Sequence, residues 1–239
     1  MATFVLVTGA WHGSWCWKRV RKALTALGHE VFTPTLTGLA ERSHLSSPSI
    51  DLNTHIDDVA NLIRWEGLED VVLVGHSYGG CVIGGVADRM ADRIAALVYL
   101  DAIVLEDGQS LYDTLPPEDR QAQVAAIEAT GDGWRVSPIP AEVFNVNPAD
   151  RDWVNAQCTE QSINCFQQKL KLANPAHSAR AIHYIYASGW EGALLAAHYA
   201  AAKARGWSTR EIECGHDIML DRPEELTAAL LEIAASAAH

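Results

Sequence analysis

The chain has 239 residues, of which 49% are hydrophobic and 20% charged, a composition typical of one globular domain with a sizeable core. The formal net charge of -12, with no cluster of Lys or Arg, disfavours a nucleic-acid partner, because phosphates need basic side chains. No apolar stretch approaches the roughly 20 residues that a membrane-spanning helix requires, so no membrane partner is expected.

The first half of the chain alternates predicted strands and helices. Short apolar runs bounded by turn residues predict strands, and apolar residues at helical spacing predict helices. In chain order these are a strand at 4–7, a helix at 15–27, a strand at 30–32, a polar loop at 35–49, a helix N-capped by Asp51, a strand at 71–74, a turn at 75–80, a helix to about Met90 and a strand at 94–100.

The alternation of predicted strands and helices stops over residues 105–180, which contain six of the nine prolines. We interpret this segment as a mostly helical cap inserted over the sheet, within a single domain that spans 1–239. The alternation then resumes with a strand at 182–186, a helix at about 192–205, a strand at 208–213 and a last helix. Asp221 and Glu224 have the spacing of a capping box for that helix, with Pro223 in its first turn.

Strands that alternate with helices predict an α/β fold with a parallel sheet covered by helices on both faces. In such sheets ligands bind where the strands end, at the carboxyl edge. The loops that follow the strands ending at Val7, Val74, Leu100, Tyr186 and Glu213 are therefore expected to converge on one site.

The strongest motif is GHSYGG at residues 75–80, which has the form G-x-S-x-G between a strong strand and a helix. In that context the motif predicts a tight turn that exposes Ser77 as a nucleophile, with Gly75 and Gly79 leaving room for the turn. A phosphate-binding loop is the competing interpretation. It would need G-x-G-x-x-G or a Gly-Lys-Ser/Thr ending, and neither is present.

A serine hydroxyl is a weak nucleophile and needs a base. Among the ten histidines, His216 has the best placement, because it follows the last predicted strand and so lies at the same edge as Ser77. His76 adjoins the serine but is expected to point into the sheet and to be structural. His12 is a candidate for contact with the substrate.

The third catalytic residue should be a carboxylate that orients the imidazole and stabilises its charged form. Asp101 ends a buried strand next to the strand of the nucleophile, where an ionised carboxylate needs a partner. Glu191 is the alternative, although it begins the following helix. Asp217 adjoins His216 too closely to reach the far ring nitrogen. Asp101 is our candidate, which gives the chain order Ser77, Asp101, His216.

Acyl transfer also needs N–H donors for the developing oxyanion. The backbone N–H of Tyr78, directly after the nucleophile, is one candidate. The second is Ala10 in the glycine-containing loop TGAWHGS at residues 8–14. Trp11, His12 and Trp15 from this loop, with Leu111, Trp134 and Phe144 from the cap, are the candidate substrate-binding residues.

The motifs LVTGAWHGSW at 6–15, GHSYGG at 75–80 and Gly215-His216 followed by Pro223 resemble one branch of the α/β-hydrolase superfamily. This branch contains plant methyl esterases, such as salicylate methyl esterase, and hydroxynitrile lyases, with bacterial esterase relatives. The resemblance spans nearly the whole chain. It implies a helical cap over a narrow pocket and hydrolysis of small esters without a cofactor.

Three positions depart from the family pattern. Thr8 stands where relatives usually have His, and Trp190 stands roughly where esterase relatives place their catalytic Asp. Asp101 instead resembles the arrangement in some haloalkane dehalogenases. Asp217 stands where hydroxynitrile lyases carry a lysine for cyanide, and a carboxylate there would repel cyanide, which argues against the lyase.

The five cysteines form no C-x-x-C pair and have no matching His spacing, so no metal site is expected. Their odd number and scattered placement indicate reduced thiols in a cytoplasmic protein. The start of the chain, MATFVLVTGA, runs straight into a strand, and we expect no signal peptide.

These features predict a serine hydrolase that cleaves a small carboxylic ester, aromatic or a lactone, through an acyl-enzyme. Two alternatives stay open on the same fold. One is lyase, lactonase or cofactor-free oxygenase chemistry, and the other is a small-molecule receptor derived from a hydrolase. The oligomeric state is also open, a homodimer being one arrangement.

Overall fold

Six parallel strands form a sheet in the order β2-β1-β3-β4-β7-β8 in the computed structural model, which describes residues 1–129, 132–173 and 181–237. Their bounds are β1 Thr3–Val7, β2 Glu30–Phe32, β3 Val71–His76, β4 Ile94–Leu100, β7 Ile182–Ala187 and β8 Ser208–Ile212. β1 and β3 are neighbours in this order, so the loops that follow them meet at the carboxyl edge. The predicted parallel sheet is confirmed.

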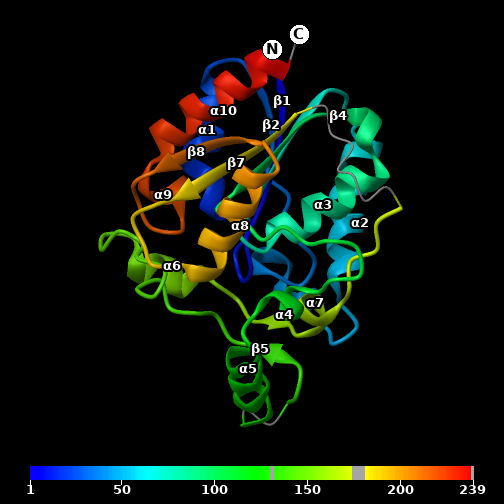
Figure 1. Cartoon of the computed structure of the whole chain (residues 1–239), viewed down its shortest axis with the longest axis vertical. Helices are drawn as coiled ribbons and strands as arrows, with labels where there is room; N and C mark the ends of the chain where they lie inside the picture. The colour runs from blue at the N-terminus through cyan, green and yellow to red at the C-terminus, as the bar shows by residue number, and fades with distance from the viewer. Residues whose placement is uncertain (130–131, 174–180, 238–239) are drawn as a thin grey trace.

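Successive residues of the central strands face opposite layers of helices, because side chains alternate along a strand. Phe4 and Leu6 of β1 belong to the core that includes α1 (Lys18–Ala26) and α10 (Pro223–Ala237). Val5 and Val7 belong to the core that includes α2 (Leu52–Trp65), α3 (Gly79–Arg89) and α8 (Ala193–Ala204). Figure 1 shows α1 beside α10, with α2 and α3 on the other side of the sheet. Burial on both faces explains why the strand sequences are continuously apolar.

Local structure follows the predicted elements with three differences. The segment at 15–27 divides into a 3-10 helix η1 (Ser14–Trp17) and α1, and the polar loop at 35–49 contains a 3-10 helix η2 (Ala40–Leu45). A third, η3 (Ala91–Arg93), precedes β4. The N-cap at Asp51 is confirmed, since its carboxylate accepts a hydrogen bond from Thr54 N–H.

The last predicted helix corresponds to α10, which begins at Pro223 as expected, and a short helix that was not predicted, α9 (Ile218–Asp221), precedes it. The predicted capping role of Asp221 is wrong, because its carboxylate accepts hydrogen bonds from Asn147 and from Gly215 N–H instead. This carboxylate therefore ties the loop after β8 to the segment that precedes α6.

The chain between β4 and β7 crosses the carboxyl edge of the sheet, and its described part contains the helices α4 (Leu111–Thr114), α5 (Pro117–Ala129), α6 (Arg151–Gln157) and α7 (Asn164–Gln167). An antiparallel pair, β5 (Arg135–Val136) and β6 (Gln161–Ser162), was not predicted. In Figure 1 this insertion lies at the end of the molecule opposite both termini, with α5 farthest out. Residues 130–131 and 174–180 of the predicted cap lie outside the described residues. No helix in the described ranges is long and apolar enough to cross a membrane.

Candidate active site

Ser77 occupies a strained turn between β3 and α3. Its φ of 53° lies in the left-handed region, which non-glycine residues rarely adopt outside functional sites. A Cβ on Gly75 would lie 2.5 Å from the carbonyl oxygen of Gly79, and one on Gly79 would lie 2.7 Å from the carbonyl oxygen of Thr8. Both positions therefore require glycine, as the G-x-S-x-G motif predicted.

His216 and Asp101 meet at the carboxyl edge although 115 residues separate them. Nδ1 of His216 lies 2.7 Å from Oδ2 of Asp101, and both side chains are buried. Asp101 directly follows β4 and has a φ of 41°, a second strained position at this edge. His216 N–H donates to the carbonyl oxygen of Phe144, so the cap insertion directly holds the histidine loop.

Trp190 is a second partner of Asp101, and sequence reasoning did not predict this contact. Its indole Nε1–H donates to Oδ2 of Asp101 at 3.0 Å, while Ala187 N–H donates to Oδ1 at 3.3 Å. The Trp190 ring also lies 4.9 Å from the His216 ring. Trp190, the residue that departs from the family pattern, thus donates a hydrogen bond to Asp101, the carboxylate that we selected because it follows a strand. Glu191, the alternative acid, is exposed.

Ser77 and His216 line the same cavity. Since Nδ1 of His216 faces Asp101, Nε2 is the ring nitrogen that is free to accept a proton. Within the described residues the Ser77 hydroxyl makes no hydrogen bond, so no contact between it and the His216 ring is present in this structure. Catalytic hydrogen bonds of this kind often shorten only when substrate is bound.

Ala10 and Tyr78, the expected oxyanion donors, line the cavity together with Ser77. Neither backbone N–H donates a hydrogen bond to another described residue. Tyr78 directly precedes α3, and its N–H shares the partial positive charge of that helix N-terminus. The Tyr78 hydroxyl is bound elsewhere, 2.9 Å from Nδ1 of His55.

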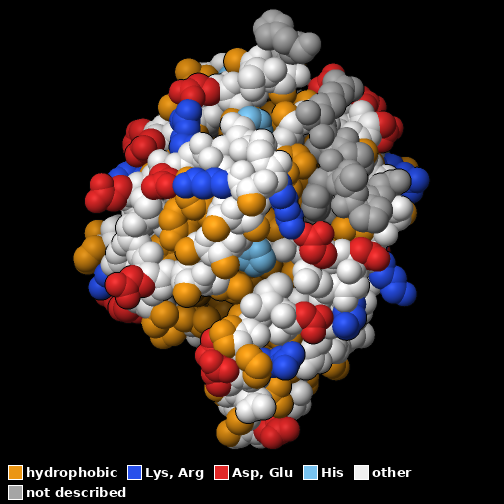
Figure 2. All heavy atoms as spheres, viewed as in Figure 1, with side chains coloured by type: hydrophobic (Ala, Val, Ile, Leu, Met, Phe, Trp, Pro, Cys, Tyr) orange, Lys and Arg blue, Asp and Glu red, His pale blue; other side chains and the backbone are white. Residues whose placement is uncertain are grey.

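The cavity has a volume of about 520 Å³ and a mostly apolar wall. Three of the six predicted substrate-binding residues line it, namely Trp11, Leu111 and Phe144. Sequence reasoning missed further lining residues from the cap and from α8, among them Leu115, Ile139, Phe166 and Leu194. Figure 2 shows hydrophobic side chains around a hollow between α8 and the protruding α5.

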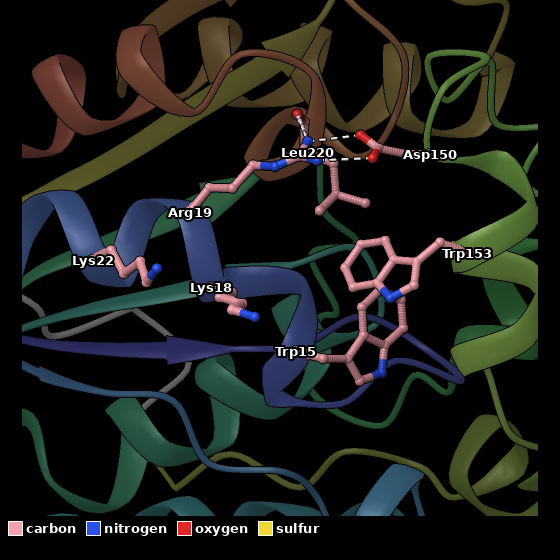
Figure 3. A pocket seen from close by; sticks show the side chains of 7 residues that line it. All are labelled: Trp15, Lys18, Arg19, Lys22, Asp150, Trp153 and Leu220. Carbon is pink, nitrogen blue, oxygen red and sulfur yellow. Dashed lines mark hydrogen bonds and ion pairs between the residues drawn. The ribbon is translucent and has the colours of Figure 1, made fainter.

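The other three predicted substrate-binding residues do not line this cavity. His12 is buried against Asp217, with Nε2 3.2 Å from Oδ2. Trp15 lies in a separate outer groove beside Trp153 (Figure 3). Trp134 is half-buried and stacks on the guanidinium of Arg135. These placements correct the prediction that the three residues contact the substrate. Aromatic residues near the motifs also pack in the hydrophobic core.

Asp217 also differs from the expectation. It is fully buried and does not line the cavity, so its charge faces His12 rather than a substrate. Asp217 is therefore not placed to repel cyanide in the cavity, contrary to the expectation from the sequence.

A family model described as "Alpha/beta hydrolase family" matches residues 4–230, which include every residue of the site above. The chain belongs to this family. As an α/β hydrolase it is 44% identical over 238 residues to a carbendazim hydrolyzing esterase of Nocardioides sp., covering 96% of this chain and 98% of the relative. It is 31% identical over 147 residues to methylesterase 2 of Arabidopsis thaliana, covering 57% of this chain and 50% of that relative.

Solved structures show the same fold. An extracellular α/β-hydrolase from a Paenibacillus species has a TM-score of 0.85 and 24% identity, covering 98% of this hydrolase and 99% of that chain. Methylesterase MES16 from Arabidopsis has a TM-score of 0.77 and 21% identity, covering 99% and 100%. The fold, the resemblance to the methyl esterase branch and the class of ester hydrolase are confirmed.

Proposed function

We propose that this hydrolase cleaves small uncharged carboxylic esters through an acyl-enzyme, with Ser77 as nucleophile, His216 as base and Asp101 as the acid that orients it. The observation that carries the proposal is the buried hydrogen bond between Asp101 and His216, which aims the other ring nitrogen at the cavity that holds Ser77.

The first half of the reaction forms the acyl-enzyme. Oγ of Ser77 attacks the ester carbonyl carbon while its proton passes to Nε2 of His216. The carbonyl oxygen becomes an oxyanion that the N–H groups of Ala10 and Tyr78 stabilise. His216 then returns the proton to the alkoxide, so the alcohol leaves and the acyl group stays on Ser77.

Water completes the reaction. It loses a proton to His216 and attacks the acyl carbon, and the second tetrahedral intermediate collapses as His216 protonates Oγ of Ser77. The acid is released and the serine is restored. Asp101 stays ionised throughout and stabilises the imidazolium that forms in each half.

The charge of the cavity supports uncharged substrates. None of the described residues that line it is Lys or Arg, and Asp119 at the cap end is a carboxylate. An anionic substrate would therefore meet repulsion without a compensating cation, whereas the anionic product is favoured to leave. The relative named as a carbendazim hydrolyzing esterase makes carbendazim a candidate substrate beside simple aryl esters.

The test is turnover of p-nitrophenyl acetate and of carbendazim by the wild-type chain and by Ser77→Ala. We expect Ser77→Ala to lose turnover by at least about a thousandfold, because the nucleophile is gone. A burst of one p-nitrophenol per chain should precede steady turnover in the wild type if deacylation is the slower step. Turnover that survives Ser77→Ala would exclude the serine mechanism, and ligand binding without turnover would favour the receptor alternative.

A cytoplasmic location and the oligomeric state, including a homodimer, stay predictions from the sequence. Size-exclusion chromatography with light scattering measures the second directly.

A further inference from the structure

A buried group of charged and polar side chains lies beside the catalytic histidine but outside the cavity. Asp217 is fully buried, and its two oxygens face two histidines. Oδ2 lies 3.2 Å from Nε2 of His12, and Oδ1 lies 3.6 Å from Nε2 of His76. None of these three side chains has a role in the reaction described above.

His12 must carry both ring protons. Its Nδ1 lies 2.7 Å from the carbonyl oxygen of Ala10 and its Nε2 lies 3.2 Å from the carboxylate of Asp217, and both partners only accept hydrogen bonds. Burial alone would lower the pKa of His12, but the charge and hydrogen bond of Asp217 raise the pKa above its ordinary value. Burial would likewise raise the pKa of Asp217, yet His12 holds that pKa far below its usual range. The two side chains are an ion pair.

One end of this pair holds the loop that carries the proposed oxyanion donor. His12 donates to the carbonyl oxygen of the peptide between Ala10 and Trp11, and the N–H of the same peptide donates to Oε1 of Gln161 at 3.0 Å. Trp11 has a φ of 64°, so the peptide is clamped at a strained turn. Both clamping side chains are buried, which keeps competing water away from the two bonds.

The other end holds the loop that carries the catalytic base. Asp217 follows His216 directly, and the carbonyl oxygen of His216 accepts hydrogen bonds from Nε2 of His76 at 3.1 Å and from Ile218 N–H at 3.0 Å. Burial, together with the neighbouring His216, keeps the pKa of His76 well below its ordinary value, so His76 stays neutral. The His12–Asp217 contact therefore joins two loops that are 205 residues apart.

Two tryptophans cover the pair from the outer groove. Trp15 stacks on His12 with ring centroids 5.0 Å apart, and Trp153 packs edge-on against Trp15 at 4.9 Å (Figure 3). In the same groove Arg19 binds both oxygens of Asp150 and the carbonyl oxygen of Leu220. These contacts close the site to solvent, and a buried charge interaction is screened less than an exposed one.

We propose that the His12–Asp217 ion pair is a positioning device that holds the Ala10 oxyanion loop in register with the loop that carries His216. The inference rests on the proposed function and extends it. Neither side chain contacts the substrate. They fix the distance between the Ala10 N–H, which stabilises the oxyanion, and the His216 ring, which transfers the proton. Both groups must be correctly placed in the transition state.

The device depends on the charge of His12. A neutral His12 keeps one N–H and must release either Ala10 or Asp217, so the loop is held only below the pKa of His12. Asp217→Asn removes the charge that raises this pKa, so the alkaline limb of kcat should move to lower pH. The other titratable groups that act on the pair are His76, His216, Cys16 and Cys158.

The test compares Asp217→Asn with the wild type. We expect kcat to fall by roughly tenfold or more while KM changes by less than about threefold, because the loss falls on the transition state. Affinity for trifluoroacetophenone, which forms a tetrahedral adduct on serine, should fall in parallel with kcat. Asp57→Asn is the control, since it removes an exposed carboxylate that is ion-paired with Arg89 and should leave kcat of the folded protein unchanged.

Each outcome decides the proposal. A folded Asp217→Asn with wild-type kcat, inhibitor affinity and alkaline limb overturns it, as does a loss of kcat that only follows the folded fraction measured by circular dichroism. If the single variant does not fold, the double variant His12→Gln/Asp217→Asn, which buries no unpaired charge, should fold and show the same loss of kcat. Turnover retained by Ser77→Ala would instead refute the underlying serine mechanism.

Discussion

At the scale of single residues, our proposal that Asp101 is the catalytic acid rests on a few contacts around its carboxylate. Its Oδ2 accepts hydrogen bonds from both His216 and Trp190, whereas Glu191 is exposed. Sequence reasoning placed Asp101 at a strand end and left Glu191 as a rival. Two candidates for the acid were open because the family pattern places an acid near position 190, which holds a tryptophan in this chain.

We expect Asp101→Asn to lower kcat by about a thousandfold or more and Glu191→Gln to change it by less than about threefold. An amide at position 101 no longer stabilises the imidazolium, while a change at an exposed carboxylate leaves the site intact. Trp190→Phe, which removes one of the two N–H donors on Oδ2, should fall between the two. Steady-state kinetics with p-nitrophenyl acetate measure all three, and a larger loss for Glu191→Gln would refute our assignment.

At the scale of elements, the turn from β3 to α3 depends on close backbone contacts that leave no room for a side chain. A Cβ on Gly79 would lie 2.7 Å from the carbonyl oxygen of Thr8 and 3.0 Å from that of Val7, both on β1 and its loop. Gly84, one and a half turns further along α3, offers only ordinary contact, the nearest atom lying 3.5 Å away.

Gly79→Ala should therefore destabilise the fold by about 1–3 kcal/mol and lower kcat, because β1 and its oxyanion loop must move away. Gly84→Ala should stabilise it by up to about 1 kcal/mol with activity retained, since alanine favours the helix. Urea unfolding and esterase turnover of the two variants test this contrast. Equal behaviour of the two would show that the elbow tolerates a side chain.

At the scale of the whole molecule, stability should fall on acidification because several histidines are buried in the neutral form. Burial lowers the pKa of His55, His76 and His183, and lowers the pKa of His198 to about 4. Since the unfolded chain binds these protons near pH 6.5, it binds more protons than the native state between about pH 6.5 and 4. The stabilisation is complete above that window and is lost as the pH falls through it.

For His198, which is partly exposed, this linkage amounts to about 1–3 kcal/mol between pH 7.5 and 4. The measurement is the free energy of unfolding in urea at several pH values. His198→Gln should flatten the acid limb, whereas His44→Gln, a change at an exposed histidine, should leave it as in the wild type. A stability that does not change between pH 7.5 and 5 would contradict the prediction.

The sequence by itself determined the parallel sheet, the elbow around Ser77, and the placement of His216 and Asp101 at strand ends. Each of these depends on a local pattern: apolar runs, glycines at fixed offsets, and a polar residue directly after a strand. Such patterns act over a few residues and can be read without knowing what packs against them.

Only the tertiary structure decided which cap residues line the cavity, that Trp190 donates to Asp101, and that His12 and Asp217 are paired. Trp11, Trp15 and Trp134 were all predicted to bind substrate, yet of these three only Trp11 lines the cavity. These outcomes depend on contacts between residues far apart in the chain, 89 apart for Trp190 and Asp101 and 205 for His12 and Asp217. No local pattern encodes such contacts, because folding selects them by the joint fit of shape, charge and hydrogen bonds in the buried interior.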